Sequence, residues 1–131
     1  MEDNSLDTKK LTAIAALFVH AAKIDEEYTD KEKEIIINFL NLFTKNNHLI
    51  NDILKEAELI DEKSNQLLNY TTILKKSSLK SKTMVIEKLW KIILSDNNSD
   101  EYENNLMRRI CGLIYFPDKL SGEIKDKIKK N

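Results

Sequence analysis

Apolar residues recur every three or four positions along most of the chain, which is the spacing of one face of an α-helix. Seven stripes of this kind predict seven helices. The first stripe is flanked by further apolar residues, so we expect its helix to be central and to contact several others. The stripes consist, in order, of Leu11, Ile14, Ala15, Phe18 and Ala22; Ile35, Ile36, Phe39, Leu40, Leu42 and Phe43; Leu49, Ile50, Ile53, Leu54 and Ala57; Leu67, Tyr70, Ile73 and Leu74; Val85, Ile86, Leu89, Ile92 and Ile93; Leu106, Met107, Ile110, Leu113 and Ile114; and Leu120, Ile124 and Ile128.

Residues between the stripes are of the kinds that begin and end helices. The segment TDKE at 29–32 is a capping box and predicts the start of the second helix. The pairs NN at 46–47 and SS at 77–78, with DEKS at 61–64, predict further breaks. Pro117 suits the first turn of the last helix. Because none of these breaks is long enough to separate domains, we expect one all-α domain over residues 1–131, a compact bundle of about seven helices.

Composition and charge narrow the classes of protein. Charged residues make up 33% of the chain and apolar residues 41%, which is typical of soluble globular domains. The net charge of −1 gives no overall attraction to nucleic acid. The longest apolar run is too short to span a bilayer, and the single cysteine excludes an intramolecular disulfide. We therefore expect a cytoplasmic protein with no transmembrane segment and no nucleic-acid partner, and peripheral membrane association stays open.

The chain contains an internal repeat. Residues 17–40 (LFVHAAKIDEEYTDKEKEIIINFL) align with residues 88–111 (KLWKIILSDNNSDEYENNLMRRIC), an offset of 71 residues. Asp25 aligns with Asp96, and Glu32 aligns with Glu103. Each copy is therefore a helix, an acidic turn and a second helix.

The four aligned acids are directed toward the interior. Helical projection places Glu32 and Glu103 on the apolar stripes of their helices, and Asp25 and Asp96 end the preceding helices on the buried side. Removing a carboxylate from water is costly, so each acid needs a partner. Two kinds of partner are open at this point.

The first kind is the backbone of the helix itself. Glu32 and Glu103 occupy the third helical position, where a carboxylate bonds to the free amide of the cap, and Thr29 and Asp100 would be the caps. The second kind is a hard cation, Ca²⁺ or Mg²⁺, held by oxygens. Asp96, Asn98 and Asp100 have the first spacings of an EF-hand loop, but the glycine and the final glutamate of that loop are absent.

The segments AAKIDEEYTDKEKEII and LWKIILSDNNSDEYENNLMRRI resemble the two signature segments of the tellurite-resistance TerB-like family. The resemblance extends from about Leu11 to Ile124. It implies a compact all-helical domain with adjacent acidic turns, a role in bacterial stress and metal resistance, and binding of divalent cations. The acidic positions of the family correspond to Asp25, Glu32, Asp96 and Glu103 here, whereas Glu26 and Asn97 stand where the family has glycine.

These observations support three functional hypotheses. The first is a non-enzymatic stress-response module and scaffold that binds Ca²⁺ or Mg²⁺. The alternative is a metal-free interaction domain or homodimer whose acids serve only as caps and ion pairs. The third, an enzyme using clustered carboxylates, has no nucleophile or cofactor motif to support it. The partner would be another protein or a second copy, and the metal ligands of the first hypothesis are Asp25, Glu32, Asp96, Asn98, Asp100 and Glu103.

Other chemically active side chains have structural explanations. The only two arginines, Arg108 and Arg109, project to opposite sides of their apolar stripe. We interpret His20 as a boundary residue and Cys111 as a buried, unreactive thiol. Trp90 lies at the edge of its stripe, where it either packs between helices or anchors a partner.

Overall fold

The chain folds as a bundle of helices. The computed structural model describes residues 8–23, 28–64, 67–96 and 101–130. Within these ranges there are seven α-helices and no strand, which confirms the predicted fold class, and a short 3-10 helix follows the fifth α-helix. The helices are α1 (Thr8–Ala22), α2 (Asp30–Leu40), α3 (Asn47–Ser64), α4 (Leu67–Lys75), α5 (Leu79–Ile93), η3 (Leu94–Asp96), α6 (Glu101–Ile114) and α7 (Asp118–Lys130).

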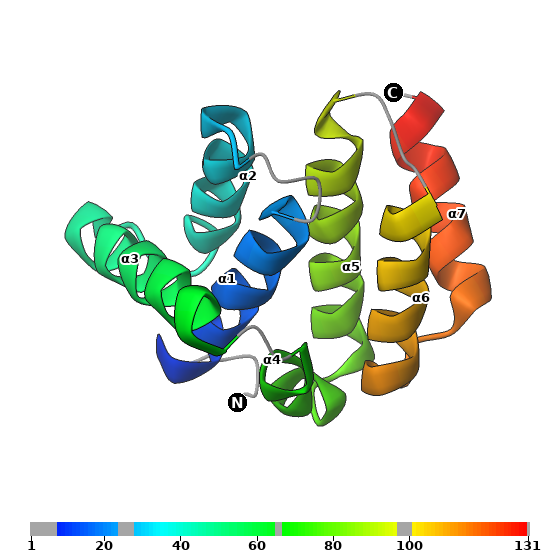
Figure 1. Cartoon of the computed structure of the whole chain (residues 1–131), viewed down its shortest axis with the longest axis horizontal. Coiled ribbons are helices and arrows are strands. Elements are labelled where there is room, and N and C mark those ends of the chain that lie inside the picture. Colours follow the sequence, from blue (N-terminus) through cyan, green and yellow to red (C-terminus); the bar gives the residue numbers. More distant parts are fainter. Residues whose placement is uncertain (1–7, 24–27, 65–66, 97–100, 131) are drawn as a thin grey trace.

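Two helices, α1 and α5, lie beside each other in the middle of the bundle (Figure 1). Helices α2, α3 and α4 pack around α1, and α6 and α7 pack against α5. The two copies of the internal repeat are the pairs α1–α2 and α5–α6. The molecule therefore has two related halves that meet along α1 and α5.

The core centres on α1, as its apolar surroundings predict. Phe18 meets Phe39 of α2 with the two rings perpendicular and their centres 5.0 Å apart. Burying a side chain of this size contributes about 1.5–3 kcal/mol, so α1 is a main source of stability. Its buried residues are Leu11, Ile14, Ala15, Ala16, Leu17, Phe18, Val19, Ala21 and Ala22.

Two sequence predictions are wrong at the ends of helices. The segment at 61–64 does not interrupt the helix, because α3 continues through Ser64. Asp61 in this segment is buried among polar partners, and the helix therefore tolerates it. Leu42 lies beyond the end of α2 and is 59% exposed, since the chain no longer follows the helical period there.

The end of α6 has an unusual residue in a left-handed conformation. Tyr115 has φ 60°, and 69% of its surface is exposed. The amide of Phe116 donates a hydrogen bond to the carbonyl of Cys111 at 2.8 Å. The amide of Tyr115 donates one to the carbonyl of Gly112 at 3.4 Å. These bonds form a Schellman motif, in which glycine is the usual residue at the left-handed position. Phe116 is buried and closes the bundle at this end.

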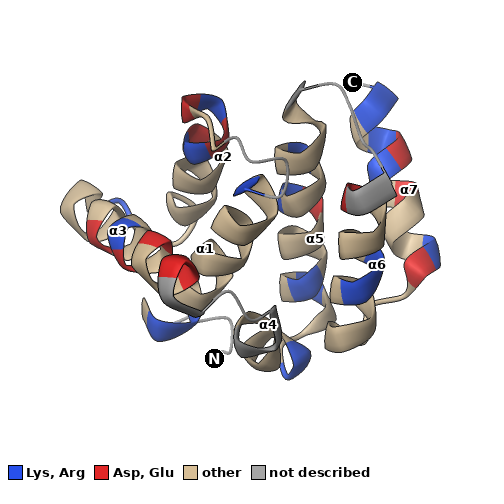
Figure 2. Ribbon diagram, viewed as in Figure 1, with Lys and Arg blue, Asp and Glu red and all other residues tan. Residues whose placement is uncertain are grey.

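Charge is distributed unevenly over the surface. Helix α3 has five acids and two lysines, whereas α7 has three acids and five lysines. These helices lie at opposite ends of the longest axis (Figure 2). Among the described helices, none has the length and apolar character needed to cross a membrane.

Candidate functional site

The first acidic corner comprises the residues that follow α1 and the start of α2, residues 23–32. Thr29 caps α2: its hydroxyl oxygen accepts a hydrogen bond from the Glu32 amide at 3.2 Å. In return, the Thr29 amide donates to Oε1 of Glu32 at 2.8 Å. This is the predicted capping box, and it satisfies two amides that the helix leaves unpaired. Glu32 is only 6% exposed, as its place on the apolar stripe predicts.

The second acidic corner comprises η3 and the start of α6, residues 94–103. Glu103 is the third residue of α6, as Glu32 is the third residue of α2. It is 4% exposed, so the second glutamate is also directed inward. Both glutamates therefore occupy equivalent and buried positions in the two halves of the repeat.

A lysine joins the two corners. The ammonium of Lys31, in the first turn of α2, donates to the backbone carbonyl of Ser95 in η3 at 2.7 Å. This hydrogen bond connects residues 64 positions apart in the chain. The ends of α1 and α5 and the starts of α2 and α6 lie toward the same end of the bundle (Figure 1). The predicted neighbourhood of the two corners is thus present in the parts of them that the structure describes.

Several of the predicted ligands fall outside the described residues. Asp25, Asn98 and Asp100 are among them, and for Asp96 the structure describes the backbone, which ends η3, but not the side chain. Within the described ranges, no group of three or more His, Cys, Asp or Glu side chains is arranged to hold a metal ion. The full ligand set therefore stays a prediction.

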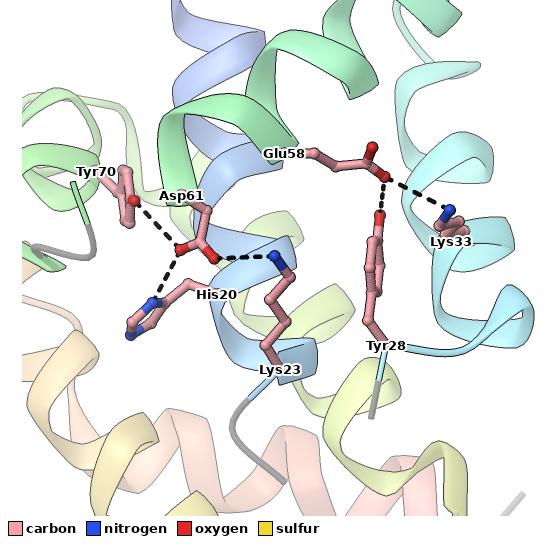
Figure 3. Close-up of polar contacts among 7 residues, drawn as sticks. All are labelled: His20, Lys23, Tyr28, Lys33, Glu58, Asp61 and Tyr70. Carbon is pink, nitrogen blue, oxygen red and sulfur yellow. Dashed lines mark hydrogen bonds and ion pairs between the residues drawn. The ribbon is translucent and has the colours of Figure 1, made fainter. Parts of the chain in front are cut away.

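The structure adds a buried acid beside the first corner that the sequence did not single out. Asp61 of α3 is 6% exposed. Its Oδ1 accepts a hydrogen bond from the Tyr70 hydroxyl at 3.3 Å and lies 3.1 Å from Nδ1 of His20 (Figure 3). Its Oδ2 lies 3.6 Å from the ammonium of Lys23, the residue that follows α1. Asp61 thus connects α1, α3 and α4.

A second acid of α3 holds the other side of the first corner. The Tyr28 hydroxyl donates to Oε2 of Glu58 at 2.7 Å, and the ammonium of Lys33 lies 3.8 Å from the same oxygen (Figure 3). Burial, followed by the hydrogen bond to Glu58, raises the pKa of Tyr28 above its usual value. Glu58 and Asp61 are three residues apart and therefore lie on one face of α3. From that face they fix residues on both sides of the first corner.

A signal for Asp61 was present in the sequence. The buried positions Ile50, Leu54 and Ala57 continue at helical spacing to residue 61. The polar residues of the segment DEKS at 61–64 also fit a break between two helices, and this interpretation overlooks the continued spacing. His20, interpreted as a boundary residue, is indeed partly exposed, and its partner could not be identified without the packing of α3 on α1.

Comparison with known proteins gives one finding. The sequence model of a protein family described as "Tellurite resistance protein TerB" matches residues 11–126 of this chain. No curated protein and no solved structure matches it. The matched range covers both acidic corners and extends from α1 into α7.

Proposed function

This chain belongs to the TerB family of tellurite resistance proteins, and from that premise we propose that it is a non-enzymatic module of tellurite resistance that binds a divalent cation between its two acidic corners. The observation that carries the proposal is the hydrogen bond from Lys31 to the Ser95 carbonyl, which brings the two corners together. Aspartates that are remote in the sequence can then contribute to one site.

The donor set suits a hard cation. Carboxylate and amide oxygens are the ligands that Ca²⁺ and Mg²⁺ prefer. Asp25 and Asp96 would be the principal ligands, with Asn98 and Asp100 in support and the buried Glu32 and Glu103 behind them. The Lys31 ammonium supplies positive charge at the same junction, so the affinity we propose is weak.

Cation binding would give the module its role as a scaffold. The two corners belong to different halves of the bundle, so an ion held by both would restrict their relative motion. The ordered junction would then present the starts of α2 and α6 to another protein or to a second copy of the chain.

One observation favours a metal-free alternative. Oε1 of Glu32 already accepts hydrogen bonds from the backbone amide and the hydroxyl of Thr29. A carboxylate engaged in this way stabilises the helix start with no ion. In this alternative the corners are structural, and the module acts only through its surface.

Thermal melting with added cation distinguishes the two. With Ca²⁺ or Mg²⁺ at about ten times its dissociation constant, we expect a stabilisation of about 1.4 kcal/mol, which raises Tm by about 5 °C. Asp96→Asn should abolish the rise. Asp52→Asn is the matched control, because the Asp52 side chain is 59% exposed and belongs to α3, outside both corners.

The control decides how a rise is interpreted. If Asp52→Asn removes the rise in Tm as completely as Asp96→Asn does, the ion acts through general surface charge, and a cation site at the acidic corners is excluded. An unchanged Tm in excess Ca²⁺ and excess Mg²⁺ would establish the metal-free alternative.

A further inference from the structure

A groove lies between α5, α6 and α7, on the half of the molecule that α7 covers. Its volume is about 370 Å³, within the range of small-molecule sites. Trp90, Met107 and Ser121 line its floor and are at most 5% exposed. The indole N–H of Trp90 donates to Oγ of Ser121 at 3.0 Å, which fixes the floor in place. The groove is therefore preformed.

The rim of the groove is mainly cationic. Arg108 of α6 and Lys125 of α7 both line it, and Asp118 is the one acid among the lining residues. The Lys125 ammonium donates to Oδ1 of Asn104 at 2.9 Å and lies 4.9 Å from the centre of the Trp90 ring. In the part of the chain that the structure describes, neither cation forms an ion pair with a carboxylate. Their charge is therefore available to a ligand.

The start of α7 adds to the positive potential. Asp118 and Ser121 belong to its first turn, where backbone amides carry partial positive charge. The dipole of α7 therefore adds to the positive potential that Arg108 and Lys125 produce at this end of the groove. The Asp118 carboxylate offsets part of this potential, so the remaining preference is for a ligand of low charge.

Gly122 lines the groove and leaves the backbone of α7 without a side chain there. Gly122 lies inside α7 with no heavy atom within 4 Å of the place where a Cβ would be, and its φ is not positive. Glycine inside a helix costs about 1 kcal/mol relative to alanine. Neither packing nor backbone conformation requires it, and the space that it leaves opens into the groove. The bare backbone at Gly122 gives a ligand room to approach α7 from the groove.

We propose that this groove binds a small organic anion through a phosphate or carboxylate group. Arg108 and Lys125 hold the anionic group, and the apolar part of the ligand packs against Trp90, Met107 and the bare backbone at Gly122. Arginine and lysine both bind such groups through charge-assisted hydrogen bonds. The site is separate from the acidic corners and does not depend on cation binding there.

The single tryptophan gives a direct measurement. We would titrate the full chain with phenyl phosphate, benzoate and inorganic phosphate at constant ionic strength, and follow the Trp90 indole N–H and the Gly122 amide by NMR. We expect saturable shifts of both signals with phenyl phosphate or benzoate, and weaker binding of inorganic phosphate. The tighter of the two aromatic anions identifies the group. If neither signal shifts with any of the three, the proposal is wrong.

Adjacent arginines supply a matched pair of variants. Arg108→Gln should weaken binding about tenfold, whereas Arg109→Gln makes the same change of charge outside the lining of the groove and should leave affinity unchanged. Equal losses in the two variants would reveal general electrostatic attraction in place of a site.

The two glycines supply a second matched pair. Gly112 also lies inside a helix with open space around it, but it does not line the groove. Gly112→Ala and Gly122→Ala should both raise Tm, because alanine favours a helix. Gly122→Ala alone should weaken binding, by about tenfold. Equal affinity in both variants would contradict the proposed approach of the ligand to α7.

Discussion

The pairs α1–α2 and α5–α6 repeat one layout, but different helices cover them. The acid-rich α3 packs on the first pair, and its Asp61 and Glu58 engage polar groups around the corner. The lysine-rich α7 packs on the second pair, and its Lys125 lies over the Trp90 ring. The repeated unit therefore builds the core, and the covering helix determines which chemistry lies beside it.

The largest expected effect is on stability and tests the contacts that α3 makes with the first pair. Asp61→Ala removes a buried carboxylate that pairs with His20, Lys23 and Tyr70. We expect a loss of about 2–4 kcal/mol in the free energy of unfolding, because Asp61 is buried with three polar contacts and the Tyr70 hydroxyl, which loses one of its hydrogen bonds, stays buried. Urea denaturation at pH 7 measures it. Glu62→Ala, at the exposed neighbouring residue, should change stability by less than about 0.5 kcal/mol.

The corresponding substitution in α7, which covers the second pair, should lower the free energy of unfolding by less. Ser121→Ala removes neutral hydrogen bonds, to the Trp90 indole and to the Cys111 thiol, so we expect a loss of about 1–2 kcal/mol. The same urea experiment gives the value. A loss as large as that of Asp61→Ala would contradict the expectation that the ionic contacts around Asp61 contribute more to stability than the neutral hydrogen bonds of Ser121.

A pH series sharpens the comparison further. Tyr28→Phe removes the hydrogen bond to Glu58 and should cost about 1–2 kcal/mol at pH 8. Because the pKa of Tyr28 is raised in the folded state, the unfolded chain loses this proton first as the pH rises through about 10. The contribution of Tyr28 is therefore complete below pH 10 and is lost above it.

The measurement is urea denaturation of both proteins between pH 8 and pH 11. The difference in stability between the unmodified protein and Tyr28→Phe should narrow above pH 10. A difference that stays constant over this range would mean that the phenol ionises as easily in the folded protein as in the unfolded chain.

The smallest effect is a gain at the end of the second pair. Tyr115→Gly should stabilise the protein by about 0.5–1 kcal/mol, because glycine adopts a φ of 60° without strain. Thermal melting should show a rise of a few degrees. A fall in Tm would mean that the contact between Lys75 and the Tyr115 ring contributes more than the strain removes.

Sequence patterns predicted what depends on local periodicity and capping. The stripe of α5, with Val85, Ile86 and Leu89, is buried as expected, and Thr29 and Glu32 form the capping box. Both features arise within one or two helical turns, so neighbouring residues determine them. The prediction that Leu42 is buried was wrong, because the apolar stripe in the sequence continues past Leu40, the residue at which α2 ends.

Features that depend on contacts between distant helices were missed. Asp61 obtains its partners only when α3 packs on α1 and α4. In the sequence alone, the polar segment at 61–64 resembles a break between two helices. The groove combines side chains of separate helices, among them Arg108 of α6 and Lys125 of α7. Helical projection placed Arg108 on a flank of its helix but could not identify the helix that faces it.

The central position of α1 has a consequence for biosynthesis. This helix precedes α3, α4 and α5 in the chain, and its core is complete only when all three have packed against it. At about 5–20 residues per second, a ribosome needs about 4–14 seconds to synthesise the residues from the end of α1 to the end of α5. During that interval the nascent chain exposes a helix that is apolar on nearly every side, which makes it a natural substrate for chaperones.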